Sequence, residues 1–133
     1  MSFHLKEIKK YQVSPGAGRA KASVRLARLS CEDIGVFKGG KDEAVRELQR
    51  QHAFLEELQG LLYAEHKHKV LIVLQAMDTA GKDSTIRMVF EGVNPQGVRV
   101  ASFKVPSVEE ADHDYLWRAH QKVPAKGEIV IFN

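Results

Sequence analysis

The stretch Val70-Leu-Ile-Val-Leu-Gln-Ala-Met-Asp-Thr-Ala-Gly-Lys-Asp-Ser-Thr85 decides the fold. It begins with an unbroken aliphatic run, residues 70–74, and the segment 69–75 that contains this run is typical of a strand buried on both faces of a sheet. A polar loop with one glycine follows over residues 76–81, and a helix is expected after it to about Glu91. A loop between strand and helix can point successive backbone N–H groups at an anion, helped by the positive end of the helix dipole. The stretch therefore predicts a phosphate-binding loop.

The loop matches most of the pattern G-x-x-x-x-G-K-[ST] that describes such sites. Gly81 lets the backbone approach a phosphate closely, and Lys82 adds a positive charge. Two positions differ, because Ala76 stands at the first glycine and Asp83 replaces the hydroxyl that usually meets Mg²⁺. The candidate phosphate-binding residues are Thr79, Ala80, Gly81, Lys82, Asp83 and Ser84.

Asp78 is the one residue of this loop whose charge needs an explanation. Its carboxylate would repel phosphates unless a divalent cation lay between them. Alternatively, Asp78 faces solvent or accepts hydrogen bonds from its own loop. The residues alone leave both interpretations open.

An amphipathic helix precedes the decisive stretch, and two more strands follow it. The helix is expected from an N-cap at Asp42 to about Tyr63 or Glu65, because apolar residues recur at threes, fours and sevens. Residues 98–103 and 128–133 form the other expected strands, so the order after the first helix is β-α-β-α-β. This alternation predicts an α/β fold of three layers, with a parallel sheet and helices on both faces.

Arg118 is the candidate basic residue of the last helix. Ser107 and Glu110 have the spacing of a capping box, so the helix is expected to begin there and to carry Arg118. On a solvated face, Arg118 would pair with Asp114, four residues before it.

The charge of the chain is unevenly distributed. The 133 residues carry a formal net charge of +3, yet residues 1–30 hold seven basic side chains and one acidic side chain. We interpret residues 1–38 as a basic arm, which either lies solvated against a folded body or helps to attract a polyanion. Only Phe3 and Tyr11 are aromatic within residues 1–30, so nucleic acid is not favoured as a partner.

Composition excludes several classes of protein. The single cysteine, Cys31, excludes an internal disulfide framework and a multi-cysteine metal site. The longest aliphatic run, residues 70–74, is far shorter than the roughly 20 residues of a membrane span. The first twelve residues lack the apolar segment of a secretory signal. We therefore expect a cytoplasmic enzyme or binding protein that does not bind membranes.

Four segments, in order, resemble the family-2 polyphosphate kinases. Residues 74–83 resemble the family's phosphate loop, G-M-D-x-A-G-K-[DG]-G, and residues 90–98 resemble its N-P-x-G-V segment. Residues 115–118 resemble its arginine-bearing helix, and residues 127–133 resemble its third strand, G-E-[IL]-V-[IL]-F-[DN]. The resemblance covers roughly residues 38–133 and implies that residues 39–133 are the N-terminal portion of a P-loop kinase domain.

The resemblance also implies an activity, which is phosphoryl transfer between inorganic polyphosphate and nucleotides with Mg²⁺. It implies that Asp78 helps to bind the metal, that Lys82 binds phosphates and that Arg118 reaches phosphate, so these three are the candidate catalytic residues. The asparagine at position 133 makes the sequence similar to the branch of the family that also accepts nucleoside monophosphates. The resemblance therefore implies that AMP and ADP are the acceptors. We expect the protein to be a homo-oligomer.

Two other functions stay open at this stage. One is an ATP-dependent P-loop kinase of a nucleotide or small molecule, since a fold does not fix its donor. The other is a non-catalytic module that binds polyanions. A third strand has little reason to end a chain, because a three-stranded sheet leaves edges to cover. We therefore expect the protein to continue past Asn133, and the isolated 133 residues to turn over negligibly.

Overall fold

A computed structural model describes residues 30, 37, 39–77 and 79–133. Contacts divide the chain into two units, Met1–Ala44 and Val45–Asn133, and the second unit contains the sheet. The basic arm expected for residues 1–38 lies almost wholly outside the described residues. Within those residues, no helix has both the length and the apolar character needed to cross a membrane.

The long helix that the apolar spacing predicted is α2, Lys41–Glu65. It begins one residue before Asp42, which therefore lies in the first turn and not at the N-cap. There its charge still interacts favourably with the helix dipole. The apolar stripe is narrower than predicted, since Val45 and Leu58 are exposed and the half-buried leucines are those seven residues apart: Leu48, Leu55 and Leu62.

The sheet consists of three parallel strands, as the alternating pattern predicted. They are β1 (Val70–Val73), β2 (Val98–Ala101) and β3 (Ile129–Phe132), and their order across the sheet is β1-β3-β2. The last strand in sequence is thus the central one, and it pairs in parallel with both neighbours.

The strand with the most deeply buried side chains is β3, and not β1. Val130 and Ile131 are 0% exposed, because β3 has a hydrogen-bonded neighbour on each side. In β1, three of the four residues are exposed, since it pairs with β3 alone among the described strands. The prediction that residues 69–75 form a doubly buried strand was therefore wrong. An aliphatic run does not by itself distinguish a central strand from an edge strand.

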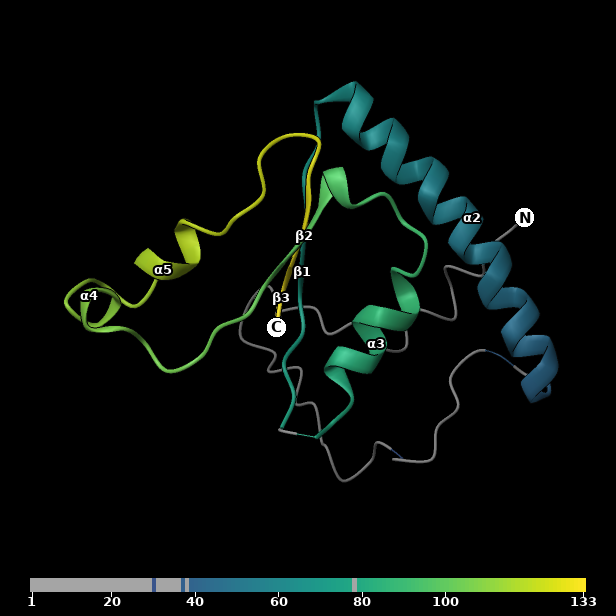
Figure 1. The fold of residues 1–133 in the computed structure, drawn as a ribbon, viewed down its shortest axis with the longest axis horizontal. Coiled ribbons are helices and arrows are strands. Elements are labelled where there is room, and N and C mark those ends of the chain that lie inside the picture. Colours follow the sequence, from purple (N-terminus) through teal and green to yellow (C-terminus); the bar gives the residue numbers. More distant parts are fainter. Residues whose placement is uncertain (1–29, 31–36, 38, 78) are drawn as a thin grey trace, which may run out of the picture. The chain divides into compact units, whose positions relative to one another are not determined.

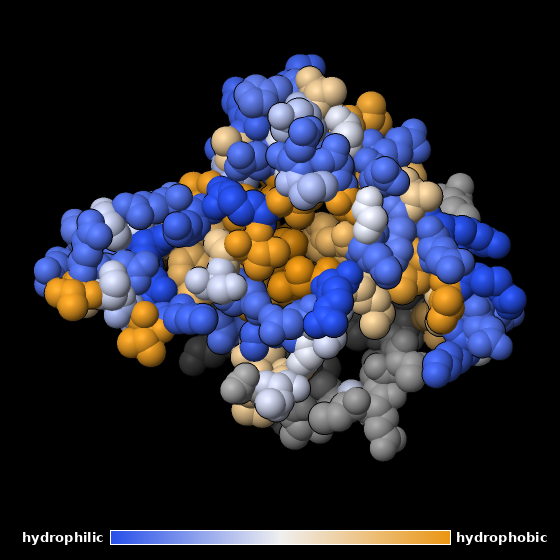
Figure 2. Space-filling view, viewed as in Figure 1, coloured by the Kyte–Doolittle hydropathy of each residue, from blue (hydrophilic) through white to orange (hydrophobic). Residues whose placement is uncertain are grey.

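The helices flank the sheet on both sides. Helix α3, Lys82–Val89, leads from β1 towards β2, and α4 (Val108–Ala111) and α5 (Trp117–His120) lie between β2 and β3 in sequence. Figure 1 shows α3 on one side of the strands and α4 and α5 on the other. Figure 2 shows apolar side chains open to solvent in the middle of this face, framed by hydrophilic ones.

The helix expected to run from Ser107 through Arg118 is in fact two short helices. The capping box is present, because Ser107 Oγ accepts from the Glu110 N–H at 3.2 Å and the Glu110 carboxylate accepts from the Ser107 N–H at 2.9 Å. The chain leaves the helix after α4, where Asp114 Oδ1 accepts from the Leu116 N–H at 2.9 Å. Such a local side-chain bond competes with helical hydrogen bonding. The prediction of one continuous helix was therefore wrong.

The crossover from β1 to β2 packs against α2. Gly97 ends the 3₁₀ helix η3, Pro95–Gly97, and a Cβ at Gly97 would collide with the side-chain amide of Gln59. Gln59 is only 3% exposed. His52 Nε2 also lies 2.6 Å from the Met88 carbonyl oxygen in α3. These contacts connect α2 to η3 and to α3.

Candidate functional site

The carboxyl ends of the three strands lie together at one edge of the sheet. Hydrogen bonds continue one step past the strands, from the Leu74 N–H to the Phe132 carbonyl at 2.9 Å and from the Phe103 N–H to the Asn133 carbonyl at 2.8 Å. Leu74, Phe103 and Asn133 are therefore neighbours. In parallel α/β sheets, the crevice outside the carboxyl ends of the strands is where ligands bind.

The loop after β1 turns sharply into α3. Gly81, at the N-cap of α3, has φ 83°, and Thr79 has φ 63°. Glycine adopts this left-handed region freely, whereas a residue with a side chain does so only at a cost. Backbone strain of this kind is concentrated at binding and catalytic sites. The Gly81 carbonyl accepts from the Thr85 N–H at 2.9 Å and so begins the helix.

Lys82 closes the loop from the helix side. Its Nζ donates to the carbonyl oxygens of Ala76 and Met77, each at 3.2 Å. An ammonium group has three N–H donors, so these two bonds leave one for a ligand. Lys82 is thereby held at the mouth of the loop with its charge next to the backbone that the sequence predicted to bind phosphate.

Two clefts open at this edge of the sheet, and Lys82, Phe103 and Asn133 line both of them. The first, which we call the loop cleft, has a volume of about 500 Å³. The second, the arginine cleft, has a volume of about 470 Å³. The two clefts therefore adjoin at Lys82, Phe103 and Asn133.

The lining of the loop cleft contains all the residues predicted to bind phosphate. The six predicted residues in this lining are Thr79, Ala80, Gly81, Lys82, Asp83 and Ser84. The other four lining residues are Ser102, Phe103, Lys104 and Asn133. The structure thus brings the predicted residues together and adds a second lysine. Their role in binding phosphate stays a prediction.

The arginine cleft brings Lys82 and Arg118 into one lining. Arg118 Nη2 donates to the Lys104 carbonyl oxygen at 2.9 Å, and Arg118 Nε lies 3.6 Å from Glu110 Oε1. The side chain is 15% exposed. The alternative in which Arg118 pairs with Asp114 on a solvated face was therefore wrong, because Asp114 caps the turn before α5 and Glu110 is the carboxylate that Arg118 meets.

Side-chain oxygen atoms of the kind that can bind a metal ion are also present at this edge of the sheet. Asn133 Nδ2 donates to Asp83 Oδ1 at 2.6 Å, and Asn133 Oδ1 is buried with no hydrogen-bond partner among the described residues. Across the same part of the chain, no three His, Cys, Asp or Glu side chains come close enough to hold a metal together. Asp78, the predicted metal ligand, lies outside the described residues.

The sequence interpretation missed several lining residues of the clefts, among them Ser102, Phe103, Lys104 and Tyr115. The first three of these follow β2, which ends at Ala101, so the rule that ligands bind beyond the carboxyl ends of strands could have found them. Tyr115 lies in the break between α4 and α5, which the spacing did not reveal.

The fold and the site together define the class of protein. It is a parallel α/β protein in which a sharply turned loop connects the first strand to the next helix, and Lys82 and Lys104 line the cleft beside this loop. Residues 38–133 match the family described as Polyphosphate kinase 2 (PPK2), and the chain belongs to this family.

Individual relatives agree with this assignment. The chain is 58% identical over 126 residues to an "AMP/ADP-polyphosphate phosphotransferase" of Meiothermus ruber, covering 95% of this chain and 45% of the relative. It is 48% identical over 100 residues to an "ADP-polyphosphate phosphotransferase" of Rhodopseudomonas palustris, covering 75% of this chain and 35% of the relative. The chain thus spans less than half the length of these relatives.

A solved structure is also similar. The crystal structure of Polyphosphate Kinase 2 from Arthrobacter aurescens TC1 superposes with a TM-score of 0.79 at 40% sequence identity. The superposition covers 86% of this chain and 42% of that one. The α/β arrangement with three parallel strands is therefore shared with a solved member of the family.

Proposed function

We propose that this chain forms the phosphate-binding part of a polyphosphate-dependent nucleotide kinase built on a P-loop kinase core. The reaction would transfer the terminal phosphoryl group of inorganic polyphosphate to a nucleoside mono- or diphosphate such as AMP or ADP. The observation that carries the proposal is that two clefts meet at Lys82. A transferase needs a donor and an acceptor with their reacting atoms side by side.

The charges around the clefts suit phosphate ligands. Lys82 and Lys104 line the loop cleft, and Lys82 and Arg118 line the arginine cleft. Lys82 uses two of its three N–H donors on the loop backbone, so one donor would be left for an oxygen of the phosphoryl group in transit. Catalysis in this chemistry consists almost entirely of positioning and charge stabilisation, which these side chains can supply.

The names of the relatives support polyphosphate as donor. The Meiothermus ruber relative is an "AMP/ADP-polyphosphate phosphotransferase" and the Rhodopseudomonas palustris relative an "ADP-polyphosphate phosphotransferase". We infer the same donor and acceptors for the protein to which this chain belongs. A cytoplasmic location and a homo-oligomeric state stay predictions from the sequence.

Mg²⁺ fits the donor atoms at this edge of the sheet. Carboxylate, amide and phosphate oxygens are the ligands that Mg²⁺ prefers, and it usually binds through one or two carboxylates together with substrate phosphates. Asp78 would hold the ion, and the buried amide oxygen of Asn133 is an acceptor that no described residue uses. When bound, the ion neutralises charge on the phosphates.

Donor dependence tests the proposal. The full-length polypeptide that carries this sequence is incubated with AMP or ADP, Mg²⁺ and polyphosphate, in the absence of any nucleoside triphosphate, and ADP and ATP are quantified by chromatography. We expect products to form at a rate that depends on polyphosphate. A strict need for a nucleoside triphosphate would instead favour an ATP-dependent kinase. Binding of polyphosphate without transfer would favour a binding module.

A further inference from the structure

The direction of the Arg118 guanidinium is set by its neighbours. Its Nη2 donates to the Lys104 carbonyl at 2.9 Å, its Nε lies 3.6 Å from Glu110 Oε1, and its central carbon lies 5.2 Å from the centre of the Phe103 ring. Since only 15% of the side chain is exposed, Arg118 has lost much of its hydration. A cation in this position needs a nearby negative charge, and the carboxylate that its contacts identify is that of Glu110.

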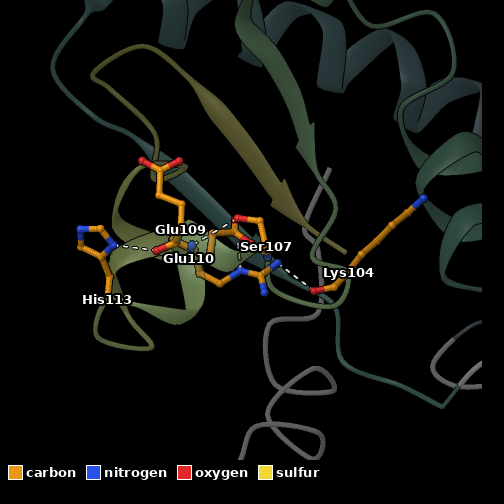
Figure 3. A network of polar contacts seen from close by, with 6 residues as sticks. Lys104, Ser107, Glu109, Glu110 and His113 are labelled. Atoms are coloured by element: carbon orange, nitrogen blue, oxygen red, sulfur yellow. Dashed lines mark hydrogen bonds and ion pairs between the residues drawn. The ribbon is translucent and has the colours of Figure 1, made fainter.

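Glu110 uses its two carboxylate oxygens for two different purposes. Oε2 accepts from the backbone N–H of Ser107 at 2.9 Å and completes the capping box of α4, while Oε1 faces Arg118. Figure 3 shows the compact network around Ser107, Glu110 and the Lys104 carbonyl. The helix cap thus fixes the position of the carboxylate, which has little rotational freedom left.

We propose that Glu110 is a positioning residue for Arg118. The capping box holds the Glu110 carboxylate, and the carboxylate holds the guanidinium at the cleft that Arg118 shares with Lys82. This inference rests on the proposed function, because it gives Arg118 a phosphate group to bind. Side chains that bind a ligand need supporting partners of this kind to keep the productive geometry.

The ion pair with Glu110 can orient Arg118 without using up the N–H donors of its guanidinium. At 3.6 Å the ion pair is longer than a hydrogen bond, and Arg118 Nε has no hydrogen-bond partner within the described part of the chain. A guanidinium has five N–H donors, and the bond to Lys104 uses one of them. A phosphate can therefore bind Arg118 without displacing Glu110.

The substitution Glu110→Gln tests this role. Glutamine preserves a capping box, so α4 keeps its cap while the charge facing Arg118 is removed. We expect the dissociation constant for tripolyphosphate to rise about fivefold, with a similar fall in kcat/KM for polyphosphate and an unchanged thermal midpoint. Loss of a negative charge near a polyanion would otherwise tighten binding, so weaker binding is specific to positioning.

Two variants serve as controls. Glu109→Gln removes the same charge from the same helix, and in Figure 3 the Glu109 carboxylate points away from the network. We expect binding within about twofold of the wild type or slightly tighter. Ser107→Ala removes the Oγ acceptor of the cap but keeps the backbone N–H that donates to the Glu110 carboxylate. We therefore expect a lower thermal midpoint with unchanged binding. Weakening of binding as large as that of Glu110→Gln would show that loss of the cap, and not of the charge, explains the effect.

A double-mutant cycle decides the matter. If Glu110 acts through Arg118, then Glu110→Gln in an Arg118→Ala background should change the dissociation constant by less than about 1.5-fold. If the two substitutions raise the dissociation constant independently, so that their fold-changes multiply in the double variant, the inference is overturned. Tighter binding by the single variant Glu110→Gln would also overturn it. Should the wild type bind tripolyphosphate but transfer nothing to AMP or ADP, the proposed function fails while the binding cycle still tests Glu110.

Discussion

Asn133 and Asp83 lie fifty residues apart in sequence and are joined by a hydrogen bond of 2.6 Å from Asn133 Nδ2 to Asp83 Oδ1. Asn133 directly follows the central strand β3, and Asp83 is in the first turn of α3. The bond therefore ties the middle of the sheet to the helix that begins with Lys82. Phosphate loops usually have Ser or Thr at the position of Asp83, and here the carboxylate serves as a structural acceptor.

Replacement of Asp83 should loosen this connection. Asp83→Ala leaves the Asn133 amide without its acceptor, and we expect the free energy of unfolding to fall by about 1 kcal/mol in urea titrations. Asp83→Asn keeps an acceptor oxygen and should lose less than half as much. Equal losses in the two variants would show that the charge near the helix N-terminus matters, and that the hydrogen bond does not.

Two glycines should respond in opposite directions to alanine. Gly97→Ala would push a methyl group into the buried Gln59 side chain, so we expect a loss of about 1–3 kcal/mol in stability. Gly60→Ala, in the middle of α2, meets nothing within 4 Å and should add up to about 1 kcal/mol through helix propensity. Thermal or urea unfolding measures both. Destabilisation by Gly60→Ala would contradict the packing described for α2.

The parts of the fold that depend on local pattern could be predicted from the sequence. The helix before the first strand, the Ser107–Glu110 capping box and the strand–loop–helix order around Lys82 are all local, and the structure confirms them. Strand order is not local. The aliphatic run at residues 70–74 does not indicate how many neighbouring strands β1 has. Within the described chain, β3 pairs on both sides and β1 on only one.

The same distinction applies to the site. Six residues of the loop cleft, 79–84, are consecutive in sequence, so one motif could find them. The partners of Arg118 could not be found in this way, because Lys104 and Glu110 meet it only after the chain has turned between α4 and α5. In this turn Asp114 accepts from the Leu116 N–H through its side chain and from the Trp117 N–H through its carbonyl oxygen, which helical periodicity does not reveal.

Asp78→Asn should impair the use of Mg²⁺. Asparagine has nearly the same shape as aspartate but lacks the charge that a divalent cation needs. Titration of Mg²⁺ against the initial rate should give a weaker apparent affinity, a lower rate at saturation, or both. Glu109→Gln, on α4, removes a carboxylate outside the lining of either cleft and serves as the charge control. An Mg²⁺ profile matching the wild type would return Asp78 to the interpretation of a solvated loop residue.

Lys82 lines both clefts, and the transfer of a labelled phosphoryl group tests its role most directly. Polyphosphate labelled with ³²P is supplied with AMP and Mg²⁺ to the full-length wild type, to Lys82→Ala, and to Lys126→Ala, which removes the same charge away from both clefts. We predict that Lys82→Ala remains folded and transfers label about 100- to 1,000-fold more slowly, a loss of about 3–4 kcal/mol of transition-state stabilisation. Lys126→Ala should match the wild type. Unimpaired transfer by Lys82→Ala would contradict the assignment of the active site to the place where the two clefts meet.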